Sequence, residues 1–304
     1  MQAEYYTEKS ARSAASKFGQ MIGEAFEKVI MRVIKDYLES EHPDYELLEP
    51  ELGRKKVTLE MIGGNERQMD TVITEFGFTD PVALLEAKWL KDARHHIDKG
   101  SWILQLKEIQ KRYSTVRGAA AILAGYWTEG VAIMFMSEAE IEMVLVATDE
   151  EVYSTLQAPL DSYLGSRSYK LNPKTMRHSY PNPWDLANLL LDLQLHNELD
   201  KLAACWLNFE REVDVQGNVL TGRDLIYRSI DRLVAPLPSN PKIQSFEISL
   251  HVDTGNVIFE KFGDIESAID FLKQYFQNSE AILDKIRPKR RIGQQRLPFS
   301  GERR

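Results

Sequence analysis

Two neighbouring segments, MDTVIT at 69–74 and ALLEAKW at 83–89, decide what this chain can be. The second segment continues an apolar run at 82–85, of the kind that a sheet buries on both faces. Glu86 and Lys88 follow this run directly, and a buried charge costs several kcal/mol unless a partner or a metal compensates it. The pattern therefore predicts a buried charged site on a central strand.

The residues between the two segments predict a tight connection. Residues 76–81 read FGFTDP, and Gly, Asp and Pro are typical of turns. We therefore expect 69–76 and 82–89 to be two strands of an antiparallel hairpin.

The register of this hairpin decides which side chains meet. With Phe76 opposite Val82, Asp70 lies opposite Lys88, and Glu86 is the diagonal neighbour of Asp70. Side chains in opposite and diagonal positions are about 5 to 8 Å apart at Cβ, so the three polar groups can converge. Alternation along the strand also places Glu86 and Lys88 on one face.

Two carboxylates at one point repel each other, and a divalent cation removes that repulsion. Hard oxygen ligands favour Mg²⁺ or Mn²⁺ over zinc. Lys88 could then orient or activate a water molecule, or stabilise charge that develops on a phosphate. The alternative is an ordinary cross-strand salt bridge between Lys88 and either Asp70 or Glu86.

This pattern resembles the PD-(D/E)xK nuclease superfamily, whose members share the restriction-endonuclease-like fold. The family's first acid often follows a proline, whereas Met69 precedes Asp70 here. The resemblance implies that Asp70, Glu86 and the backbone carbonyl of Ala87 hold one or two Mg²⁺ ions, for which Mn²⁺ can substitute. It also implies that Lys88 positions or activates the attacking water.

An amphipathic helix is predicted upstream, over residues 15–39. In the resemblance, such a helix packs on the sheet and often donates another acid to the metal site. Glu24 is the preferred catalytic and metal-binding candidate, and Glu27 is the second. Either carboxylate could instead be a solvated group on the helix surface.

A second helix is predicted downstream, over residues 101–113. Some relatives place a glutamine on this helix to position DNA or the metal-site water. Gln105 is our candidate for that role, although a surface glutamine is the commoner occurrence. The loop that leaves the lysine strand is basic, and we expect phosphate contacts from Lys91, Arg94 and Lys99.

The order of elements agrees with the resemblance over residues 15–140. Further strands are predicted at 45–48, 57–62, 119–123 and 132–136. The fold class is then α/β, with a restriction-endonuclease-like αβββαβ core and a mixed central sheet flanked by helices.

The second half of the chain predicts a smaller C-terminal α+β region. Helices are expected at 184–212 and 221–234, with Thr221 as an N-cap, then a hairpin of 244–252 with 257–262 and a helix from Asp264 to Phe276. DNA recognition, dimerisation and regulation are all open roles for it. The expected division is a nuclease core at 1–165, the α+β region at 166–284 and a basic tail at 285–304.

The tail could follow a nucleic-acid backbone, with contacts from Lys289, Arg290 and Arg291. It could equally be a solubilising tail or a docking arm. The formal net charge of the whole chain is −8, but local fields rather than the total decide phosphate contact.

Composition limits the class of protein. No apolar run in the 304 residues approaches a membrane span, and no phosphate-binding loop motif is present, so neither a membrane nor a nucleotide cofactor is expected. The single cysteine, Cys205, excludes an intrachain disulfide framework. Its apolar neighbours predict a buried thiol, and a reducing, cytoplasmic compartment follows.

These patterns together favour a Mg²⁺-dependent DNA endonuclease resembling type II restriction enzymes, which leaves 5′-phosphate ends. Cutting both strands at one site calls for two active sites, so a homodimer is expected. Two alternatives remain: a nuclease effector of an antiphage system, gated by a partner or a signal, and a noncatalytic nucleic-acid-binding protein of the same fold.

Overall fold

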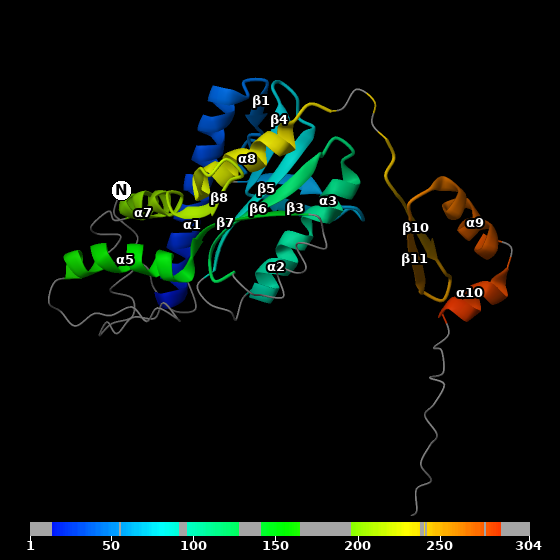
Figure 1. Ribbon diagram of the computed structural model, residues 1–304. Helices are drawn as coiled ribbons and strands as arrows, with labels where there is room; N and C mark the ends of the chain where they lie inside the picture. The colour runs from blue at the N-terminus through cyan, green and yellow to red at the C-terminus, as the bar shows by residue number, and fades with distance from the viewer. Residues whose placement is uncertain are drawn as a thin grey trace, which may run out of the picture. The chain divides into compact units, whose positions relative to one another are not determined.

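A computed structural model describes residues 14–54, 56–90, 96–127, 141–164, 196–237, 240, 242–276 and 278–286 (Figure 1). The chain divides into two compact units, Met1–Ala235 and Pro236–Arg304. In the described helices, none combines the length and apolar character needed to cross a membrane.

A mixed five-stranded sheet organises the first unit, in the order β1-β4-β5-β6-β7. The first two pairings in this order are antiparallel, and the last two are parallel. The α/β class with a mixed central sheet is therefore confirmed. The strands are β1 (Tyr45–Leu47), β4 (Thr71–Glu75), β5 (Pro81–Leu90), β6 (Gly118–Gly125) and β7 (Glu142–Thr148).

Helices cover both faces of this sheet (Figure 1). One face packs on apolar side chains from α1 (Ala14–Glu41), α5 (Asp149–Leu164), α7 (His196–Trp206) and α8 (Gly222–Val234). The other face packs on α2 (His96–Leu104), α3 (Leu106–Arg112) and a hairpin of β2 (Val57–Glu60) with β3 (Glu66–Met69).

Strand β5 shows how the two faces are kept apart. Ala83 and Leu85 belong to the apolar cluster under α1, whereas Leu84 and Leu90 belong to the cluster under the β2–β3 hairpin. Because successive side chains of a strand point to opposite faces, Glu86 and Lys88 lie on the hairpin side, in phase with Leu84.

The strand expected over 69–76 is in fact two strands. β3 ends at Met69 and pairs with β2, and β4 begins at Thr71 and pairs within the central sheet. Asp70 lies at the junction, where the chain passes from one sheet to the other.

The expected hairpin register is wrong by two residues. Thr71 pairs with Leu85 and Val72 with Leu84, so the regular ladder extrapolates to Asp70 opposite Glu86, not opposite Lys88. An irregularity between Ile73 and Thr74 changes the register near the turn. Because a shift of two residues leaves every side chain on its original face, the polar groups still converge.

The helix expected over 101–113 is divided at Gln105. The Gln105 N–H bonds to the Trp102 carbonyl, three residues earlier, so the chain tightens there. Ile103 and Leu106 are both buried on either side of this break. The strand expected at 132–136 lies outside the described residues, and the strand that pairs with β6 is β7.

The helix expected over 184–212 is also different. Residues 184–195 lie outside the described part, and α7 ends at Trp206. β8 (Glu210–Val213) then pairs with β9 (Val219–Thr221). Asp214 closes the intervening turn by accepting hydrogen bonds from two backbone N–H groups, which competes with helix formation.

Helix α8 begins where expected, after the N-cap Thr221, whose side chain forms a reciprocal capping box with Asp224. Both α7 and α8 contribute to the core on the α1 face of the sheet. The expected boundary at 165/166 therefore does not coincide with the boundary between the two compact units.

The second unit contains the expected hairpin of β10 (Phe246–His251) with β11 (Val257–Phe262). Helices α9 (Ile265–Phe276) and α10 (Ser279–Ile286) follow. Asp264 caps α9 by accepting from the Ser267 backbone, as predicted. The small buried apolar cluster of the second unit consists of Ile258, Phe271 and Tyr275.

Gly125, at the end of β6, and Cys205, on α7, both lie in the first unit. Gly125 ends β6 at a φ of 89°, and a Cβ there would lie 2.1 Å from the Leu90 carbonyl oxygen, so only glycine fits. The prediction that the thiol of Cys205 is buried is wrong, because Cys205 is exposed. Ala203 and Trp206 take the buried positions of this turn of α7.

Candidate active site

The candidate site lies where β4 leaves the edge of β5. The ladder between β4 and β5 begins with the pair Thr71 and Leu85, so the residues of β5 after Leu85 have no β4 residue opposite them. Asp70 takes the place of that strand partner. The Ala87 N–H donates to Asp70 Oδ2 at 3.2 Å. Because the N–H and C=O of one strand residue point to the same edge, the Ala87 carbonyl also faces the Asp70 side.

Lys88 joins three carboxylates at this point. Its Nζ donates to Asp70 Oδ2, lies 2.8 Å from Glu86 Oε2 and lies 3.5 Å from Glu27 Oε1. Burial by itself lowers the pKa of Lys88, but the surrounding carboxylates outweigh it and raise the pKa above its ordinary value. The amine is therefore an ammonium at neutral pH.

Asp70 is held by two lysines at once. Lys56 Nζ lies 2.5 Å from Asp70 Oδ1, and Lys88 binds the other oxygen. Burial raises the pKa of Asp70, but these cations outweigh burial and lower the pKa to about 2. Lys56 also lies 2.8 Å from Glu27 Oε2, so α1 is tied to the same cluster.

Glu86 is the most deeply buried acid, with 2% of its surface exposed. Arg67 of β3, itself only 4% exposed, donates to Glu86 Oε1 at 2.8 Å and also to the Trp102 carbonyl. Burial raises the pKa of Glu86, and the charge of Asp70 adds to this effect against the opposing cations Lys88 and Arg67. The resulting pKa is about 7.

The residues predicted from sequence are distributed as follows. Asp70, Glu86 and Lys88 are brought together, with the Ala87 backbone beside them. The helix carboxylate that reaches this cluster is Glu27, the second choice, while Glu24 lies on an exposed position of α1.

Two of the predicted nucleic-acid contacts, Lys99 and Gln105, lie in the described residues. Lys99 is exposed on α2, and Gln105 is half-buried at the junction of α2 and α3. The remaining candidates, Lys91, Arg94, Lys289, Arg290 and Arg291, lie outside the described residues.

Two members of the cluster were missed from sequence. Arg67 had a usable signal, because in a strand it lies on the same face as the apolar residue Met69, whereas Glu66 and Gln68 lie on the opposite face. Lys56 had none, since it precedes β2 in a stretch without periodicity.

The donor set fits a hard divalent cation in kind. Asp70, Glu86 and the Ala87 carbonyl offer oxygen ligands, which Mg²⁺ prefers. Among the described residues, no group of three or more acidic, histidine or cysteine side chains is already arranged to hold an ion. Binding one would require the ammonium groups of Lys56 and Lys88 to move off the Asp70 oxygens.

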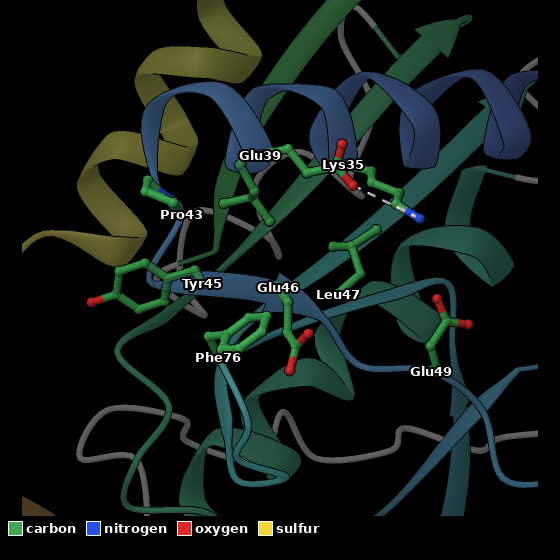
Figure 2. Close-up of a pocket in the computed structure, with 9 residues that line it drawn as sticks. Lys35, Glu39, Pro43, Tyr45, Glu46, Leu47, Glu49 and Phe76 are labelled. Carbon is green, nitrogen blue, oxygen red and sulfur yellow. Dashed lines mark ion pairs between the residues drawn. The ribbon is translucent and has the colours of Figure 1, made fainter.

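A groove of about 320 Å³ opens beside the cluster and is lined by both Asp70 and Lys56. From there it follows the exposed side of α1. A neighbouring pocket of about 310 Å³ continues it past Lys35, and Figure 2 shows Lys35 and Glu39 on α1 above Glu46 and Glu49.

Comparison of the chain with protein-family models, curated proteins and solved structures gave no match.

Proposed function

We propose that this chain is a Mg²⁺-dependent nuclease of the PD-(D/E)xK type that hydrolyses phosphodiester bonds in DNA. The observation that carries this proposal is the convergence of Asp70, Glu86 and Lys88 at one buried point where a strand leaves its sheet. Such an arrangement of buried charges is expensive for packing alone.

The order of elements supports the same assignment. Helix α1 is followed by the antiparallel strands β1, β4 and β5, then by α2 and α3, and then by β6 parallel to β5. This order agrees with the expected restriction-endonuclease-like αβββαβ core if the β2–β3 hairpin is an insertion between the first two strands of that core.

In this mechanism Asp70, Glu86 and the Ala87 carbonyl would hold the Mg²⁺, and Mn²⁺ could replace it. When bound, the ion would offset negative charge on the phosphate and lower the pKa of a bound water. Glu27 would order a water or complete the ligand set in the role first considered for Glu24. Arg67 holds Glu86 in position.

The protonation state of Lys88 decides its role. The carboxylates paired with Lys88 hold its pKa above the ordinary value, so in this cluster it is an ammonium and a hydrogen-bond donor. Lys88 therefore donates hydrogen bonds, either to the attacking water or to the phosphate oxygens as negative charge develops on them. In-line attack then leaves a 5′-phosphate and a 3′-hydroxyl, and a homodimer would supply the second site needed for a double-strand cut.

The test is digestion of supercoiled plasmid and of genomic DNA in Mg²⁺, beside EDTA and three variants. Asp70→Asn and Lys88→Ala should each lose about a hundredfold to a thousandfold in cleavage rate, whereas Lys111→Ala, which changes an exposed lysine of α3, should cut normally. Discrete bands would support a restriction-type enzyme. A smear would support a nonspecific nuclease, and cleavage that survives Lys88→Ala would contradict the assigned site.

One observation favours the gated alternative, in which a partner or a signal switches on the nuclease of an antiphage system. Lysines bind both oxygens of Asp70, so a metal ion would compete with them there, and a partner or signal that moves the lysines would favour the metal. Absence of cleavage combined with Mg²⁺ binding in calorimetry would favour this gated enzyme. Nucleic-acid binding with neither cleavage nor metal uptake would favour a noncatalytic protein.

A further inference from the structure

The groove beside Asp70 differs in charge from the rest of the chain. Four basic and two acidic residues line it, a formal excess of two positive charges, while the whole chain carries −8. Apolar side chains and Pro50 complete its walls. The charged lining residues are Lys28, Arg32, Lys35, Lys56, Glu49 and Asp70.

Three of these cations form one stripe on α1. Lys28, Arg32 and Lys35 are separated by four and three residues, the spacing that places side chains on the same helix face. At 1.5 Å per residue the stripe is about 10 Å long. In a duplex the phosphates of one strand are spaced 3.4 Å apart along the helix axis and farther apart along the backbone itself, so a stripe of this length spans about two consecutive phosphates.

Arg32 is the best placed of the three to bind an anion. It is exposed, and no acidic group of the described residues lies within ion-pair distance of it. Lys28 pairs with Asp200, and the Lys35 contact with Glu39 is 3.9 Å long between two largely exposed side chains. Exposed pairs of this kind are weak, so Lys35 can exchange Glu39 for a phosphate.

The far end of the groove reverses this charge. Beyond Lys35 the neighbouring pocket presents Glu39 and Glu46, as Figure 2 shows, and Glu49 lines both the groove and this pocket. Carboxylates at that end repel phosphate, so the cationic stretch runs only from Lys35 to the cluster at Asp70.

We propose that this groove binds the sugar–phosphate backbone of the nucleic-acid strand that enters the Asp70 site, with Arg32 as the main contact and Lys35 and Lys28 beside it. This assignment rests on the nuclease function proposed above. It identifies a phosphate-binding path along α1, separate from the basic loop and tail considered in the sequence.

The test is binding of a fluorescein-labelled duplex and of a single strand, measured by anisotropy in EDTA at several salt concentrations. Each phosphate contact contributes about −0.9 to the slope of log affinity against log salt concentration. At 0.1 M salt one contact therefore raises the affinity about eightfold relative to its value at 1 M salt. Arg32→Gln should therefore weaken binding about eightfold and reduce the slope by about 0.9. Arg32→Lys should retain most of both.

Arg232→Gln is the matched control, because Arg232 is a similarly exposed arginine on α8 and is 53% exposed at its side chain. It should bind like the wild type. Circular dichroism of each variant checks folding, and Lys35→Gln gives an independent second probe with a smaller loss in the same direction.

The outcomes separate this assignment from the nuclease function. Wild-type affinity in Arg32→Gln and Lys35→Gln overturns the groove, even if Lys88→Ala abolishes cleavage. Weakened binding in these variants without any cleavage or Mg²⁺ uptake by the wild type keeps the groove and removes the nuclease. A wild-type chain that binds neither oligonucleotide overturns the groove outright.

Discussion

The two faces of strand β5 are built on opposite principles. Ala83, Leu85 and Ala87 belong to the apolar cluster that packs under α1. Glu86 and Lys88 point toward the β2–β3 hairpin, within the same buried strand. The comparison shows that a central strand can carry charge on one face when the layer above supplies the opposite charge, which here comes from Arg67.

The energetic basis of the two faces differs as well. On the α1 face, stability comes from removing apolar surface from water, at about 25 cal/mol per Å². On the hairpin face, desolvation of the charged groups roughly offsets their attraction, so the network adds little net stability while intact. Breaking the network is costly, because the remaining partner is left buried and uncompensated.

The largest effect is expected from Arg67→Ala. It leaves Glu86 buried without its guanidinium partner, so the free energy of unfolding should fall by about 3–5 kcal/mol. Urea denaturation at pH 8, where an unprotonated Glu86 is most exposed to this cost, measures it. A loss below about 1 kcal/mol would mean that the charged face is not compensated by Arg67.

On the opposite face, Leu85→Ala should lower the free energy of unfolding by about 3 kcal/mol through lost burial and a residual cavity. Cleavage per folded molecule should remain, because Leu85 points away from Asp70 and Lys88. Parallel urea titration and plasmid digestion test both statements. Loss of cleavage at full folding would show that the two faces are not separable.

Of the two faces of β5, only the hairpin face should contribute to the pH dependence of stability. The folded pKa of Glu86, about 7, lies above the ordinary value of 4.5. Its contribution is therefore present below pH 4.5 and is lost as the pH rises through 7. Asp70, with its pKa lowered to about 2, contributes above pH 3.8 and loses this only as the pH falls through 2.

Between pH 5 and pH 8 the wild type should accordingly lose stability relative to Glu86→Gln, whose amide does not titrate. Urea denaturation of both proteins across this range gives the difference directly. Because ionised carboxylates bind the metal, adding Mg²⁺ at pH 8 should reduce the loss in the wild type only. A constant difference across the range would contradict the raised pKa of Glu86.

The smallest effect is expected for a surface pair. Arg232 of α8 pairs with Glu142 of β7, and both side chains are partly exposed. Exposed ion pairs contribute about 0–1 kcal/mol, so Arg232→Gln should change the free energy of unfolding by less than about 1 kcal/mol. A change as large as that expected for Arg67→Ala would mean that burial does not explain why the two ion pairs differ in their contribution to the free energy of unfolding.

Much of the fold could be predicted because its signals are periodic. The amphipathic pattern of α1, the apolar run of β5 and the capping residue Thr221 each reflect a local rule that tertiary structure did not override. The register of β4 with β5 could not be predicted, because the ladder is irregular between Ile73 and Thr74, whereas the prediction assumed a regular hairpin up to the turn. Cys205 was misplaced because its apolar neighbours in sequence lie on another side of the helix.

The site was predictable in its strand residues and less so in the rest. Glu86 and Lys88 stand out because they interrupt an apolar run, and Asp70 follows from their spacing. Glu27 and Glu24 differ by only three positions on one helix, so the sequence could not decide which one reaches the cluster. Lys56 reaches Asp70 through a tertiary contact that no local pattern encodes.

The glycine that ends β6 has a consequence for how relatives of this chain could be found. Any side chain at Gly125 would collide with the Leu90 carbonyl, two residues beyond Lys88. That clash is between backbone and Cβ, and no neighbouring substitution relieves it. Homologues should therefore keep glycine here even where they have exchanged Glu86 or Lys88, so a search pattern anchored on this glycine and the apolar strands around it would recover members that a Glu-x-Lys pattern misses.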